Sequence, residues 1–168
     1  KEQGEESLIL SLLREAGRSR GDLLVSLAKL AYEAHQQVRT GDDSETVTGI
    51  SEKTLLDELR KLHPERSLDW AEKIINTMKL RAGLLLERTG GTFTFPHRTF
   101  QEYLAGVHLA RQPNFSAEAL NCVEKGDFWR IVILLAVGYL VHANQDYEKP
   151  RLLIEELCPD EHAVDDIG

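Results

Sequence analysis

One stretch, residues 93–105, constrains this chain most because it combines a strand, a loop histidine and a helix. Its letters are FTFPHRTFQEYLA. Phe93 and Phe95 alternate with threonines, which is the period of a half-buried strand. Thr99 and Glu102 stand at the spacing of a capping box and so predict a helix N-terminus. The predicted helix has an apolar face, made by Phe100, Tyr103, Leu104 and Val107.

His97 stands on the predicted connection between the strand and the helix, beside the positive end of the helix dipole. A phosphate is stabilised at such a position. On the residues alone, His97 is either a phosphate ligand or a loop residue that bonds to nearby backbone. Pro96 either positions the imidazole or only ends the strand. Arg98 could also approach a phosphate, or it could be a solvated side chain.

These residues closely resemble the F-x-H-x-T-F-Q-E-Y-L-A signature of the winged-helix domain in NACHT proteins, a branch of the STAND signal-transduction ATPases. The resemblance is close over residues 93–110 and weaker over residues 23–35 and 79–88. The family includes bacterial defence proteins and animal innate-immunity receptors. The resemblance implies that His97 contacts the β-phosphate of bound ADP and thereby stabilises an inactive, closed state.

The order of predicted elements also indicates a mainly α fold, namely a winged-helix domain with a small β-hairpin, followed by a helical segment. We expect residues 1–20 to end a preceding helical segment or linker. Residues 21–112 would form the winged helix, and residues 113–168 would begin a C-terminal helical array, HEAT-like or of another kind.

Individual elements follow from apolar spacing and from turn residues. The predicted apolar stripes are Leu23, Leu27, Leu30 and Ala34 in the second helix, Leu55, Leu56, Leu59 and Leu62 in the third, and Trp70, Ile74 and Met78 in the fourth. Asp22 is expected to cap the second helix, Ser51 the third, and Ser67 or Asp69 the fourth. The expected helices are 8–13, 23–37, 51–63, 67–82, one that starts at Thr99, 116–124, 128–143 and 150–158. The expected strands are 47–50, 84–86 and 92–95, and a loop is expected at 40–44.

The chain lacks a glycine-rich phosphate loop ending in Lys and Ser or Thr, and it lacks an apolar strand ending in paired carboxylates. In NACHT proteins these parts lie upstream of the winged helix. The resemblance therefore implies a regulatory, non-enzymatic portion of a larger chain, without catalytic residues of its own. ADP or ATP would bind an upstream nucleotide-binding domain of the same chain, and the parent would self-oligomerise. We expect no tight nucleotide binding by these 168 residues alone.

The net charge of −8 disfavours attraction to a nucleic-acid duplex, so we expect no nucleic-acid partner. A winged-helix DNA-binding regulator remains an alternative. Its recognition helix, residues 69–82, would carry Lys73, Lys79 and Arg81 against two acidic residues. A helical scaffold for protein interactions is the second alternative. Acidic residues crowd positions 155–166 and predict a solvated tail.

Two cysteines, Cys122 and Cys158, have no metal-type spacing, so we expect a reduced, cytoplasmic protein. The six histidines are scattered and predict no metal site. Residues 1–6 show no signal-peptide pattern. Residues 128–141 are nearly continuously apolar but shorter than the ~20 residues that cross a bilayer, so we expect a buried core helix and no membrane partner.

Overall fold

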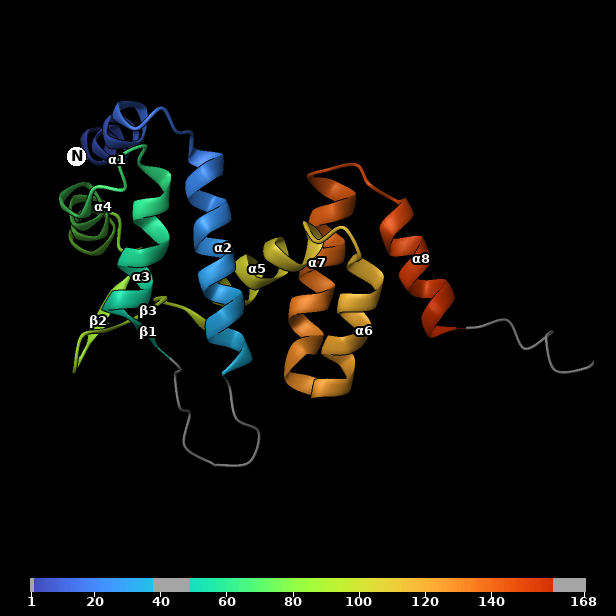
Figure 1. Cartoon of the computed structure of the whole chain (residues 1–168). Helices are drawn as coiled ribbons and strands as arrows, with labels where there is room; N and C mark the ends of the chain where they lie inside the picture. Colours follow the sequence, from blue (N-terminus) through green and yellow to red (C-terminus); the bar gives the residue numbers. More distant parts are fainter. Residues whose placement is uncertain (1, 38–48, 159–168) are drawn as a thin grey trace, which may run out of the picture. The chain divides into compact units, whose positions relative to one another are not determined.

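The computed structural model describes residues 2–37 and 49–158, and side chains from residue 8 onward (Figure 1). The loop predicted at 40–44, the first residues of the predicted strand at 47–50 and the acidic positions from 160 onward lie outside the described residues. The predicted fold class is confirmed: the chain is mainly helical and has one small antiparallel sheet.

The chain divides into two compact units after Ala105. We call the first the winged-helix unit and the second, from Gly106, the helical unit. The predicted boundaries at 20/21 and 112/113 stay predictions. The elements are α1 (Glu2–Glu15), α2 (Arg20–Gln36), β1 (Ile50–Ser51), α3 (Glu52–Leu59), a 3₁₀ turn (Arg60–Leu62), α4 (Leu68–Leu80), β2 (Leu86–Arg88), β3 (Thr92–Thr94), α5 (Arg98–Ala110), α6 (Phe115–Lys125), a second 3₁₀ turn (Asp127–Trp129), α7 (Arg130–His142) and α8 (Glu148–Leu157).

The sheet has the order β1-β3-β2, with β3 in the centre and antiparallel to both neighbours. Gly90 and Gly91 both have positive φ, so they form a hairpin turn that other residues adopt at a cost. The strand predicted at 84–86 starts later, at Leu86, because Leu84 still takes part in the C-terminal cap that follows α4. Its N–H donates to Met78 O at 3.0 Å, after Gly83 turns the chain at φ +58°.

Serine side chains begin three helices of the winged-helix unit. Ser51 Oγ accepts from Thr54 N, and Ser67 Oγ accepts from Trp70 N, as predicted. The prediction for Asp22 is wrong, because Ser19 is the N-cap of α2 and the helix begins at Arg20. Asp22 Oδ2 instead accepts from Ser19 N at 2.7 Å and completes a capping box. This backbone hydrogen bond lowers the pKa of Asp22.

The core of the winged-helix unit lies between α1, α2, α3, α4 and the sheet. The predicted α4 stripe of Trp70, Ile74 and Met78 is buried, which confirms the helical spacing. Trp70 Nε1 also donates to Leu12 O at 2.9 Å, so α1 shares this core. The buried side chains of α2 and α3 include the predicted Leu23, Leu27, Leu30, Ala34, Leu55 and Leu59.

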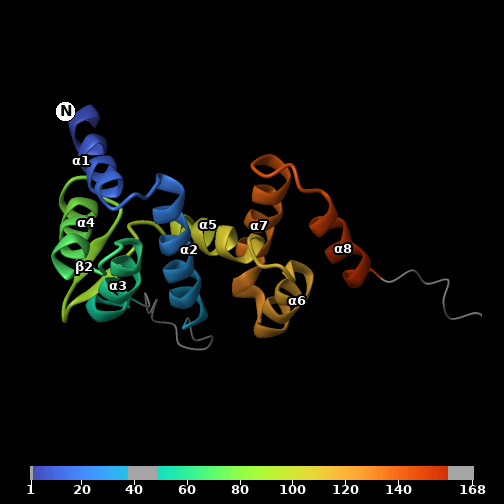
Figure 2. The ribbon, with the colours of Figure 1, turned by 45° about the horizontal axis from the view of Figure 1, so that its top comes forward.

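The helical unit contains the end of α5 and the predicted three further helices, with no strand in its described residues. Figure 2 shows α6 and α7 side by side. A Cβ added at Gly106 would lie 2.9 Å from Val132 O and 3.0 Å from Ala136 N, so α5 and α7 approach closely there. Lys149 Nζ donates to Ala110 O and to Gln112 O, each at 3.1 Å.

α7 is the predicted apolar helix, but it is buried on one face only. Val132, Ala136 and Leu140 are buried, whereas Ile131 and Leu134 are 44% and 58% exposed. The expectation of a buried core helix is therefore correct for one face of α7 and wrong for the other. Within the described residues, no helix has the length and apolarity needed to cross a membrane.

Candidate functional site

His97 lies on the connection between β3 and α5, and its side chain is exposed. Its carbonyl oxygen accepts from Phe100 N at 3.1 Å and from Gln101 N at 3.2 Å, so its backbone is fixed as the start of α5. In the described part of the chain, its imidazole nitrogens have no hydrogen-bond partner. The ring is thus free to bind a ligand although its backbone is held.

Two aromatic residues, one before and one after His97, pack against each other and hold the connection in place. Phe95 is 6% exposed, and its ring meets that of Phe100 at 5.8 Å and 78°, an edge-to-face contact. Phe93 is buried as predicted. The alternation is incomplete, because Thr94 is buried as well and its Oγ1 accepts from Arg88 Nε at 3.3 Å. Successive residues of a strand point to opposite faces, so the burial of both Phe93 and Thr94 shows that both faces of β3 are covered here.

The capping box predicted for Thr99 and Glu102 is wrong. Thr99 is the second residue of α5, and Glu102 instead accepts from Arg98 Nε at 3.0 Å. The predicted apolar face is correct for Leu104 and Val107, which are buried. It is wrong for Tyr103, which is 38% exposed.

The Arg98–Glu102 pair is a feature that the sequence analysis missed, although the spacing of four residues indicates it. The side chain of Glu102 is 8% exposed, and that of Arg98 is 71% exposed. Glu102 is the only buried carboxylate among the described residues. The pair therefore has its negative member below the surface and its positive member at the surface, next to His97.

The other described histidines lie in different surroundings. His35 is buried, and the His63 ring lies 5.5 Å from Trp70 while its Nδ1 accepts from Glu65 N. No three described His, Cys, Asp or Glu residues come together as metal ligands.

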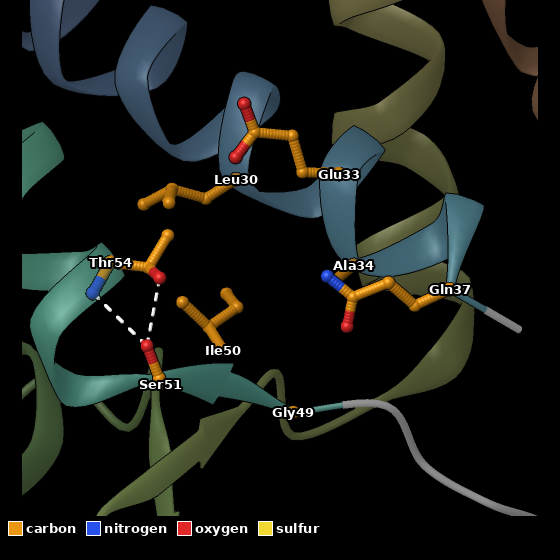
Figure 3. Close-up of a pocket in the computed structure, with 8 residues that line it drawn as sticks. All are labelled: Leu30, Glu33, Ala34, Gln37, Gly49, Ile50, Ser51 and Thr54. Carbon is orange, nitrogen blue, oxygen red and sulfur yellow. Dashed lines mark hydrogen bonds between the residues drawn. The ribbon is translucent and has the colours of Figure 1, made fainter.

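A pocket of about 130 Å³ lies between the end of α2 and the start of α3 (Figure 3). Its polar side includes Ser51 and Thr54, whose hydroxyl groups bond each other at 2.8 Å. A hollow of about 280 Å³ lies between α1 and α4. Neither is lined by a residue of the β3–α5 connection, where His97 is exposed.

The recognition helix of the DNA-binding alternative, α4, has a largely neutralised surface. Lys73 Nζ lies 2.6 Å from Asp69 Oδ2, and Lys79 Nζ lies 2.6 Å from Glu87 Oε2 on the wing. The lysines on which a phosphate backbone would depend are therefore already paired.

Comparison with known families finds one match. The sequence model of the winged helix-turn-helix domain C-terminal to NACHT matches residues 10–109, from α1 to α5, which is more than half of the chain. No curated protein and no solved structure matches. The predicted resemblance is confirmed, and the chain belongs to the family of winged helix-turn-helix domains C-terminal to NACHT.

Proposed function

We propose that this chain is the regulatory part of a NACHT-type STAND ATPase and responds to the nucleotide held by the NACHT domain upstream in the same polypeptide. The observation that carries the proposal is the exposed imidazole of His97 on a connection with a fixed backbone. The family description supports the neighbouring domain, because it places this winged helix C-terminal to NACHT.

In the proposed mechanism, an imidazole N–H of His97 donates a hydrogen bond to the β-phosphate of ADP. Such a bond to a charged group contributes roughly 1.5–3 kcal/mol. The contact forms only when the winged helix lies against the nucleotide, so it stabilises the closed arrangement over the open one. Exchange of ADP for ATP removes this preference, and the parent opens and oligomerises. This is regulation by a difference in affinity between two states.

The residues around His97 fit an anionic ligand. α5 has no acidic residue in its first turn, and the carboxylate of Glu102 in its second turn is buried and paired with Arg98. A binding group also needs a fixed position to contribute its full energy. The two hydrogen bonds to the His97 carbonyl and the Phe95–Phe100 contact supply that rigidity.

The DNA-binding alternative receives less support. The net charge is −8, and two lysines of α4 are paired with carboxylates. A gel shift at low salt is its simplest test: we expect no duplex binding, and salt-sensitive binding would favour the alternative instead.

The decisive experiment changes His97 to Ala in the full-length protein and measures how much ADP stays bound through purification. His142→Ala is the matched control, since His142 is also exposed but lies at the end of α7. We expect H97A to lose ADP and to oligomerise without a stimulus, and H142A to behave as the wild type. Unchanged ADP retention in H97A would remove His97 from the mechanism.

A further inference from the structure

The Arg98–Glu102 pair differs from other ion pairs of the same spacing. In Lys29–Glu33, Lys73–Asp69 and Arg151–Glu155, the carboxylate side chain is 42%, 75% and 55% exposed. In Arg98–Glu102 it is 8% exposed. Burial of a carboxylate has a desolvation cost, which an ordinary surface pair avoids.

Helix stability does not account for the pair. Arg98 is the first residue of α5, where a cation faces the positive end of the helix dipole. The base also precedes the acid in this pair, and this order stabilises a helix less than an acid four residues before a base. By contrast, α2, α3 and α4 each have an acidic residue in the first turn.

The hydrogen bond leaves most of the guanidinium group available. Glu102 Oε1 accepts from Nε at 3.0 Å, and within the described chain neither terminal amino group of Arg98 has an acceptor. A guanidinium group oriented at Nε still presents two N–H-bearing nitrogens, which can contact two phosphate oxygens at once. These nitrogens belong to the residue directly after His97.

We propose that Arg98 is a second phosphate-binding side chain beside His97, and that Glu102 is the positioning residue that orients it. The ligand class is a nucleoside diphosphate. This proposal rests on the proposed function, and it adds two residues to the single histidine. His97 supplies one hydrogen-bond donor to the β-phosphate and Arg98 supplies two. The two residues therefore favour ADP over AMP, which has no β-phosphate.

The experiment measures the release of fluorescent mant-ADP and the affinity for ADP and AMP in the full-length protein. Arg98→Ala is expected to speed ADP release roughly ten- to a hundredfold. Its affinity for AMP should change much less, because AMP lacks the second phosphate; a general structural defect would weaken the binding of both nucleotides. Arg98→Lys should restore ADP binding only in part, because an ammonium group is a single point charge and lacks the planar fork that binds Glu102 on one side and two phosphate oxygens on another.

Glu102→Gln tests the positioning role. We expect it to speed ADP release in the wild-type background and to add nothing in the Arg98→Ala background. Arg151→Ala is the matched control, since Arg151 is another exposed arginine paired with carboxylates of its own helix. Arg98 is 71% exposed, so its variants should fold even if Glu102→Gln does not.

The outcomes separate the two proposals. If His97→Ala speeds ADP release and Arg98→Ala does not, the role of Arg98 is wrong and the proposed function stands. If neither changes release, both are wrong. If Glu102→Gln has the same effect with and without Arg98, Glu102 does not act through Arg98.

Discussion

The winged-helix unit and the helical unit hold their helices together by different means. In the first, polar contacts join elements far apart in sequence: Trp70 Nε1 to Leu12 O, and Arg18 Nε to Leu62 O. In the second, α5 and α7 approach through the bare backbone of Gly106. The contacts named in the first unit therefore depend on particular side chains, whereas the α5–α7 contact of the second depends on the absence of one. The second unit also has a long-range polar contact, from Lys149 Nζ to Ala110 O and Gln112 O, but it does not join α5 to α7.

This difference is reflected in the helices themselves. α4 is amphipathic and buries one stripe, whereas α7 is apolar all round and still leaves Leu134 58% exposed. The buried face of an amphipathic helix can be identified from its sequence, whereas that of a helix that is apolar all round cannot.

Trp70→Ala should have the largest effect, confined to the winged-helix unit. It removes a side chain that is 3% exposed and the shorter of two hydrogen bonds to Leu12 O, which keeps only the 3.3 Å bond from Ala16 N. We expect a loss of about 3–5 kcal/mol. Hydrogen exchange of α1 and α4 should accelerate, with little change in α6 and α8. Leu80→Ala, on the same helix but 74% exposed, is the control and should change little. Equal acceleration in both units would contradict the comparison.

Gly106→Ala should destabilise the helical unit instead. The new Cβ would lie 2.9 Å from Val132 O, which is too close without a backbone shift. We expect a loss of about 1–3 kcal/mol, although alanine favours a helix by about 1 kcal/mol over glycine. Faster exchange in α7 is the readout. An unchanged exchange rate would show that α5 and α7 do not approach as described.

Glu58 provides a pH-dependent test of the winged-helix unit. Its Oε2 accepts from Lys29 Nζ and from Lys61 Nζ, each at 2.7 Å. Burial alone would raise the pKa of Glu58, but the two hydrogen bonds outweigh it, so the pKa is lowered. A carboxyl with a lowered folded-state pKa stabilises the fold above its unfolded pKa, and this contribution disappears as the pH falls through the folded value.

Glu58→Gln should therefore reduce stability by about 1 kcal/mol at neutral pH. It should also remove part of the loss that the wild type shows between about pH 5 and 3. Glu33→Gln is the control, because Glu33 is 42% exposed and 3.9 Å from Lys29. Denaturant unfolding followed across this pH range checks both. If the stability of the Glu58→Gln variant depended on pH in the same way as that of the wild type, Glu58 would not contribute to the acid-dependent loss of stability.

Gly138→Ala should have the smallest effect, and of opposite sign to Gly106→Ala. A Cβ at Gly138 would meet no described atom within 4 Å. We expect a gain of about 0.5–1 kcal/mol from helix propensity. Slower exchange in α7 would confirm it. Destabilisation would indicate that another element packs closely on this face of α7.

The sequence predicted most where one local signal determined the result. The spacing of Trp70, Ile74 and Met78 identified a buried stripe, and Ser51 and Ser67 identified two N-caps. Each follows from helix periodicity or from a side chain that bonds its own backbone, and neither requires knowledge of the rest of the fold.

Two signals competed at the start of α5. Glu102 lies three residues after Thr99 and four after Arg98, so it could complete a capping box or pair with the arginine. The ion pair forms instead of the capping box because α5 already begins at Arg98, shortly after the central strand β3 ends at Thr94. The start of a helix after a strand depends on the sheet, which local spacing does not contain.

The exposed face of α7 and the exposure of His97 also could not be predicted from spacing. α7 has no polar face to identify its outside, and Gly106 on α5 selects the face that is buried. For His97, the motif predicted the position on the connection, whereas the exposure of its side chain is seen only in the structure.

The central claim is a hydrogen bond between His97 and a phosphate. Its most direct test is a structure of the full-length protein with ADP bound. The account predicts an imidazole nitrogen of His97 roughly 2.7–3.2 Å from a β-phosphate oxygen. An imidazole that points to solvent, with no phosphate oxygen within hydrogen-bond distance, would contradict it.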